Sequence, residues 1–121
     1  MNATAPMIAF EPDLLFSSKI EGAAAKNGIE VRVVSNSEEL FRILKETTPR
    51  VLLVNLDSLE GNLAPLGELA RKKSCELVGY YSHVNTRVAG QAKNVGFDRV
   101  VSRGAFVMGL NEMLEEYLRK T

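Results

Sequence analysis

Short apolar runs alternate along the chain with segments whose apolar residues recur every three or four positions. The apolar runs predict strands at 7–10, 31–34, 51–54, 77–81 and 99–101. The intervening segments have helical spacing, and the last one shows it most clearly, with apolar positions at Phe106, Leu110, Met113, Leu114 and Tyr117. This alternation predicts an α/β domain in which crossover helices cover a parallel sheet.

Residue types at the ends of the helical segments indicate where the helices begin and stop. Asn27-Gly28 is a typical left-handed helix end. Ser35 and Asn36 each have a glutamate three residues later, which indicates an N-cap with its capping box, and that helix should stop before Pro49. Pro65 and Gly67 leave the start of the third helix open.

The strands differ in how apolar they are. Segment 51–54 is uninterrupted and aliphatic, as expected of a central parallel strand, whereas 31–34 is interrupted by a polar residue, which favours a sheet edge. Five strands with right-handed crossovers predict a flavodoxin-like three-layer sandwich with strand order 2-1-3-4-5 and five helices. In such a sheet, functional groups lie at the carboxyl ends of the strands, near the switch between strands 1 and 3.

Length and charge narrow the classes of function. The 121 residues predict one domain over 1–121, with a core over about 7–120, and 15 basic residues balance 15 acidic ones, which disfavours nucleic-acid and membrane partners. One cysteine and one histidine argue against a disulfide scaffold or a histidine-rich metal site, so no cofactor or metal is predicted. Residues 1–6 have no basic start and no apolar run reaches about 18 residues, so a cytoplasmic location is expected.

Polar residues follow four of the predicted strands at their carboxyl ends. They lie at 11–13, 55–58, 81–83 and 102–104. With its five strand–helix units, the chain resembles the CheY-like receiver domain of two-component response regulators from about 7 to 120. That resemblance implies an acidic pair after strand 1, a phosphate-accepting aspartate at the end of strand 3, a Ser or Thr after strand 4 and a Lys after strand 5.

The chain departs from this receiver pattern at the acidic positions. Glu11 keeps one carboxylate, Pro12 stands in place of the second, and Asp13 comes one position later. Asn55 matches the phosphate acceptor, and an amide has no anionic nucleophile to attack a phosphoryl donor. Because Mg²⁺ prefers carboxylate oxygens, losing two of the three acidic groups argues against metal binding.

The positions after strands 4 and 5 also differ from the receiver pattern. The Ser/Thr place aligns with either Tyr81 or Ser82, and the sequence leaves this register open. Arg103 takes the place of the Lys, with a planar fork of donors instead of a point charge. We expect Arg103 to form a salt bridge with Glu11 across the altered site.

These departures indicate a degenerate pseudo-receiver, a non-enzymatic signalling module that binds proteins independently of phosphorylation in a two-component-like system. The resemblance implies that the fourth helix, fifth strand and fifth helix, at about 85–120, meet a partner protein or a second copy. The candidates for exposed contacts there are Arg87, Gln91, Arg99, Val107, Asn111 and Tyr117.

Two other functions stay open. In the first, Asp57 is phosphorylated and Glu11 and Asp13 hold Mg²⁺. In the second, a cleft lined by Tyr81, Arg103 and Asn55 binds a small anionic ligand. An enzyme is disfavoured, because no nucleophile, base and orienting group come together in any motif.

Overall fold

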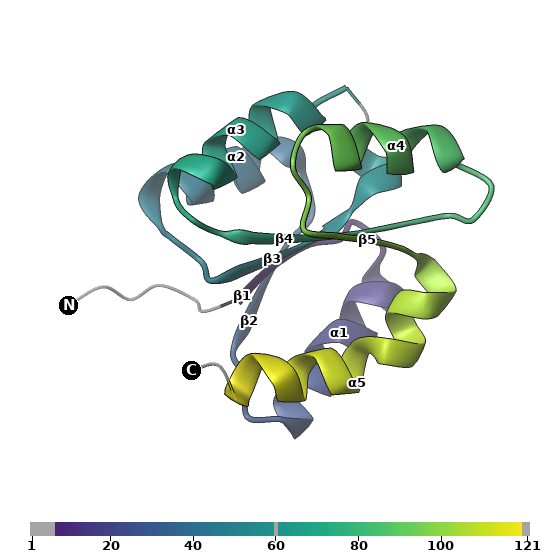
Figure 1. Ribbon diagram of the computed structural model, residues 1–121. Helices are drawn as coiled ribbons and strands as arrows, with labels where there is room; N and C mark the ends of the chain where they lie inside the picture. The colour runs from purple at the N-terminus through teal and green to yellow at the C-terminus, as the bar shows by residue number, and fades with distance from the viewer. Residues whose placement is uncertain (1–6, 60, 120–121) are drawn as a thin grey trace.

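A parallel five-stranded sheet forms the middle layer of the computed structural model, which describes residues 7–59 and 61–119 (Figure 1). The strands are β1 (Met7–Phe10), β2 (Val31–Val34), β3 (Val51–Asn55), β4 (Glu76–Tyr81) and β5 (Arg99–Ser102). Their order, β2-β1-β3-β4-β5, confirms the predicted fold class. Every residue of the central strand β3 is buried, whereas β2 at the edge is partly exposed, as its composition predicted.

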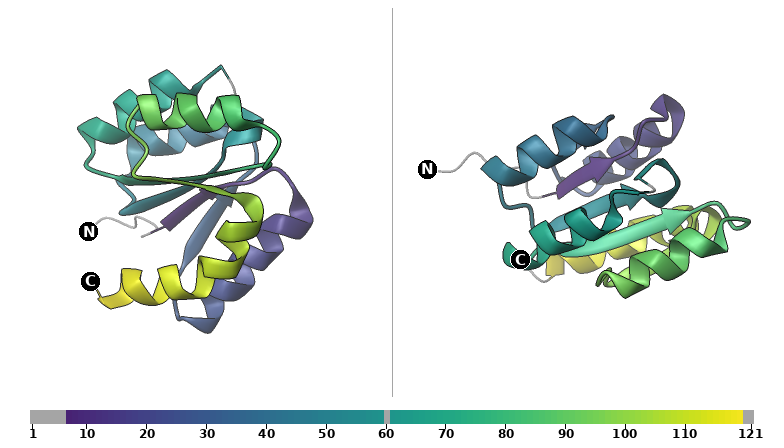
Figure 2. Two further views of the ribbon diagram at one scale, coloured as in Figure 1. Left: turned by 45° about the vertical axis from the view of Figure 1, so that its right-hand side comes forward. Right: turned by 90° about the horizontal axis from the view of Figure 1, so that it is seen from above.

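Helices cover both faces of the sheet (Figures 1 and 2). One face carries α1 (Leu14–Lys26) and α5 (Arg103–Arg119), and the other carries α2 (Ser37–Glu46), α3 (Leu63–Lys72) and α4 (Thr86–Asn94). Because side chains alternate along a strand, β3 contributes to two cores. Leu53 packs towards α1 and α5, and its neighbours Leu52 and Val54 pack towards α2, α3 and α4.

Capping side chains set the helix starts that matter for the site. Asp13 is the N-cap of α1, and its Oδ1 accepts a hydrogen bond of 2.9 Å from the N–H of Leu15. Of the two N-cap candidates before α2, Asn36 is the cap, accepting from the N–H of Glu39 at 2.8 Å. A short 3₁₀ turn, η1 (Leu56–Leu59), follows β3 and precedes α3.

Within the described residues, no helix has both the length and the apolar character needed to cross a membrane. The expectations for residues 1–6 and for Lys120 concern positions outside the described part of the chain.

Candidate functional site

Three side chains from adjacent strands meet at the carboxyl edge of the sheet. Glu11 follows β1, Asn55 ends β3 and Tyr80 lies in β4; they are 1%, 3% and 0% exposed. The register pairs Phe10 with Val54 and Asn55 with Tyr80, which brings the three positions side by side on the face covered by α1 and α5. We call these three residues the Glu11 network.

Hydrogen bonds donated to the Glu11 carboxylate hold the network together. The Asn55 Nδ2 donates to both carboxylate oxygens, at 3.1 and 3.0 Å. The Tyr80 hydroxyl donates to Oε1 at 2.6 Å, and the backbone N–H of Asp13 donates to Oε2 at 2.9 Å. A buried carboxylate is costly unless it is hydrogen-bonded, and these donors meet that need without a cation.

Tyr80 is the site residue that the sequence reasoning missed. Its ring packs between Phe16 and Phe106, with centroid distances of 5.2 and 4.3 Å. Burial, together with the hydrogen bond to Glu11, raises the pKa of the Tyr80 hydroxyl, which keeps it protonated as a donor. The alternation of side chains along β4 could have indicated this position, because Val78 and Tyr80 point to the same side of the sheet as Leu53.

Arg103 does not form the expected salt bridge with Glu11. Its guanidinium lies over the ring of Phe16, with the Cζ atom 4.9 Å from the ring centroid. Its Nε is buried and has no hydrogen-bond partner, as is also true of Asn55 Oδ1. The expectation fails because the Asn55 amide and the Tyr80 hydroxyl already occupy the carboxylate.

The Asp57 side chain forms hydrogen bonds with the loop between β4 and α4. Its Oδ2 accepts from the backbone N–H of Ser82 at 2.8 Å, and its Oδ1 accepts from Asn85 Nδ2 at 2.7 Å. Both carboxylate oxygens of Asp57 are therefore engaged in holding the loop.

The two residues aligned with the Ser/Thr place of receivers, Tyr81 and Ser82, do not join the Glu11 network. Tyr81 packs against the core on the other face of the sheet.

The six candidate contact residues separate into three groups. Arg87, Gln91 and Arg99 are exposed on α4 and β5. Val107 lines a cleft together with residues of α1, and the Oδ1 of Asn111 accepts a hydrogen bond of 3.0 Å from Asn27, the C-cap of α1, so both lie on the α1 side of α5.

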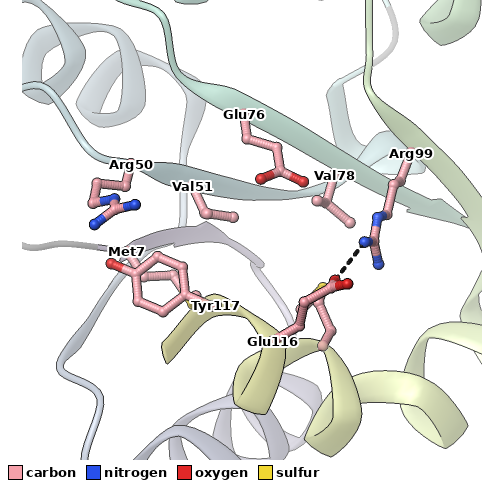
Figure 3. A pocket seen from close by; sticks show the side chains of 9 residues that line it. Met7, Arg50, Val51, Glu76, Val78, Arg99, Glu116 and Tyr117 are labelled. Carbon is pink, nitrogen blue, oxygen red and sulfur yellow. Dashed lines mark hydrogen bonds and ion pairs between the residues drawn. The ribbon is translucent and has the colours of Figure 1, made fainter. Parts of the chain in front are cut away.

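Tyr117, the sixth candidate, was wrongly expected to be exposed. Its side chain is buried, and the Cζ of Arg50 lies 5.4 Å from its ring centroid. Both residues line a cavity of about 50 Å³ between the sheet and the carboxyl-terminal half of α5 (Figure 3). Arg99 and Glu116 form an ion pair of 2.7 Å beside this cavity, which joins β5 to α5.

Several solved structures similar to this chain are response regulators or their receiver domains. A response regulator from Thermotoga maritima superposes with a TM-score of 0.76 at 14% identity, covering 93% of this chain and 96% of the other. A signal receiver domain from Bermanella marisrubri gives 0.77 at 13%, covering 93% and 97%. The beryllofluoride-activated NtrC4 receiver domain dimer gives 0.71 at 14%, covering 92% and 97%.

The likeness confirms the receiver fold that the five strand–helix units predicted. Comparison with protein-family models and with curated protein sequences finds no match. The chain therefore shares the architecture of receivers at low sequence identity. Which receiver chemistry is possible has to be judged from the residues of this chain.

The acidic residues do not fit the divalent cation that a receiver site implies. Glu11 is closed by Asn55 and Tyr80, Asp13 caps α1, and Asp57 holds a loop. Among the described residues, no group of three or more His, Cys, Asp or Glu side chains could hold a metal ion. A hard cation needs several oxygen ligands at once, and the carboxylates of Glu11, Asp13 and Asp57 each hold separate backbone or side-chain donors.

Proposed function

We propose that this chain is a pseudo-receiver that binds proteins without a phosphorylation switch, as a non-enzymatic module of two-component-like signalling. The observation that carries the proposal is the Glu11 network. At the position of a phosphate acceptor, Asn55 offers a donating amide, and the neighbouring carboxylate is already saturated. No anionic nucleophile faces a phosphoryl donor at this point.

The charges on α4 and α5 support an interaction face made by α4, β5 and α5. Helix α4 contains Arg87 and Lys93 and no acidic residue, whereas α5 carries Glu112, Glu115 and Glu116 in its carboxyl-terminal half. In a two-fold arrangement of two copies, α4 of one copy can face α5 of the other, so that opposite charges meet. A partner protein with the same charge pattern would be recognised in the same way.

A phosphorylation assay tests the absence of a switch. The chain is incubated with acetyl phosphate and Mg²⁺ and its intact mass is measured, with a phosphorylatable receiver as positive control. We expect no gain of a phosphoryl group. A phosphoryl adduct that disappears in Asp57→Asn would overturn the proposal and establish Asp57 as the acceptor.

A charge reversal tests the interaction face. Lys93→Glu changes the last turn of α4, and Lys45→Glu makes the same change in the last turn of α2, so helix-dipole effects are matched. Sedimentation velocity and affinity capture from host cells should show weaker self-association or loss of a retained protein in Lys93→Glu alone, with and without acetyl phosphate. Equal behaviour of the two variants would contradict the assigned face.

A further inference from the structure

A cleft of about 780 Å³ opens at the carboxyl edge of the sheet between the start of α5, helix α1 and the β4–α4 loop. Its size lies within the roughly 300–1,000 Å³ that is typical of small-ligand sites. None of the three residues of the Glu11 network lines it. The cleft is thus a separate concavity next to the altered phosphorylation site.

The polar lining of the cleft has one sign of charge. Lys19 of α1 and Arg103 of α5 line it, His83 adds a ring N–H donor, and none of the described residues of the lining is acidic. Within the described residues, neither Lys19 nor Arg103 takes part in an ion pair. Two uncompensated cations in one concavity favour an anionic occupant.

Arg103 is held in place for such an occupant. The Cζ of its guanidinium lies 4.9 Å from the ring centroid of Phe16, and its Nε is buried without a partner. A guanidinium already held against an aromatic ring loses little further freedom when it binds an anion, and its fork of donors suits carboxylate and phosphate oxygens.

Part of the cleft lining is apolar. Val107 is 39% exposed and Met108 is 89% exposed, and both line the cleft together with Phe16. Large apolar side chains that remain in contact with water beside a basic group favour a ligand with both an apolar and an anionic part.

We infer that this cleft binds a small amphipathic anion, a carboxylate or phosphate monoester with an apolar substituent. The anionic group lies at Arg103 and Lys19, and the substituent packs on Val107 and Met108. The cleft lies on the α1 side of α5, whereas the charges that support the proposed interaction face lie on α4 and on the carboxyl-terminal half of α5. A test of ligand binding and a test of protein binding can therefore fail separately.

Titration of the isotopically labelled protein followed by amide NMR tests the site. The probes are phenyl phosphate and phenylacetate, which distinguish a phosphate from a carboxylate ligand, with inorganic phosphate and benzyl alcohol as probes that lack one half of the chemistry. We expect saturable shifts at the amides of Lys19, His83 and Gly104 with at least one of the first two probes. Inorganic phosphate and benzyl alcohol should bind at least several-fold more weakly.

Substitutions assign the binding to the two cations. Arg103→Gln should weaken the better probe about tenfold or more, because a charge-assisted contact is lost, and Lys19→Gln should weaken it several-fold. Arg32→Gln removes the same charge from the exposed side of β2 at the far sheet edge and should leave affinity unchanged. Because Lys19 is exposed, its variant tests the site even where Arg103→Gln affects folding.

Three results would overturn the inference. They are the absence of saturable shifts with both amphipathic probes, equal affinity in Lys19→Gln and the wild type, and binding of benzyl alcohol or inorganic phosphate as strong as that of the better amphipathic probe. Each of these leaves the phosphorylation and capture tests of the proposed function unaffected.

Discussion

Asn55 determines whether Glu11 can stay buried without a cation. Asn55→Asp replaces a donating amide by an acceptor and places two carboxylates together in a site where both side chains are at most 3% exposed. Two such groups cannot both ionise without a large cost. We expect urea denaturation at neutral pH to show a loss of about 3 kcal/mol in the free energy of unfolding.

The same substitution at Asn85 is the control for Asn55→Asp. Asn85 also donates to a carboxylate, that of Asp57, but its side chain is only partly buried. Asn85→Asp should therefore cost less than half as much. The loss in Asn55→Asp should shrink at about pH 5, because a proton shared between the two carboxyl groups restores a hydrogen bond. Equal losses in the two variants would argue against a special role for the Glu11 network.

Tyr80 and Tyr81 are neighbours with different surroundings. Tyr80→Phe keeps the stacked ring but removes the 2.6 Å hydrogen bond to Glu11, and should lower the free energy of unfolding by about 1–3 kcal/mol. Tyr81→Phe removes a hydroxyl from a partly buried ring on the other face and should change it by less than about 0.5 kcal/mol. Chemical denaturation of both variants is the measurement, and a reversed order would contradict the assigned network.

Close packing of α3 against the end of α4 depends on a glycine. A Cβ added at Gly67 would lie 2.5 Å from the carbonyl oxygen of Val95, so Gly67→Ala should lower the free energy of unfolding by about 1–3 kcal/mol. At Gly90, inside α4, an added Cβ meets nothing within 4 Å, and Gly90→Ala should stabilise by about 0.5–1 kcal/mol. Thermal unfolding of both variants checks the opposite signs.

The pattern of apolar runs predicted the five strands and the edge position of β2, and the right-handed crossover rule then predicted the strand order. The start of α3 was not predicted, because Pro65 is compatible with any position in the first turn of a helix, where backbone N–H groups have no helical partner. The helix begins at Leu63, so Pro65 lies within its first turn. The 3₁₀ turn Leu56–Leu59 fills the gap before it and has no sequence period of its own.

The candidate site was predictable in position but only partly in chemistry. Glu11 and Asn55 were found from their places after strands 1 and 3. Tyr80 was missed because the run 77–81 is apolar on both faces, so the face that each side chain meets depends on its register with β3. Arg103 contacts Phe16 and not Glu11, because Asn55 and Tyr80 already donate to the Glu11 carboxylate. The residue types at the strand ends do not show which of these donors lies within hydrogen-bond distance.

Two apolar cores on opposite faces of the sheet stabilise the whole molecule. The core beneath α1 and α5 ends at the Glu11 network, whereas the core beneath α2, α3 and α4 contains the molecule's one cysteine, Cys75. Both cores contain a group that must stay protonated when buried, and this links overall stability to alkaline pH.

Cys75 should make the folded protein less stable above neutral pH. Burial, with smaller effects from Asp98 and Glu76, raises the pKa of its thiol from about 9 to about 12. The unfolded chain therefore releases this proton at lower pH than the folded protein, so the stabilisation is complete below about pH 8 and declines as pH rises. Between pH 8 and 10 the free energy of unfolding should fall by about 1.4 kcal/mol from this group.

Cys75→Ala isolates this contribution. The variant should start from a lower stability, because a buried side chain becomes smaller, but it should lack the decline between pH 8 and 10. Urea denaturation of both proteins across this range is the measurement, with Tyr80→Phe as a comparison, because Tyr80 titrates in the unfolded chain only near pH 10. If Cys75→Ala retained the full decline, another buried group would have to release the proton, and the link between this core and alkaline stability would be wrong.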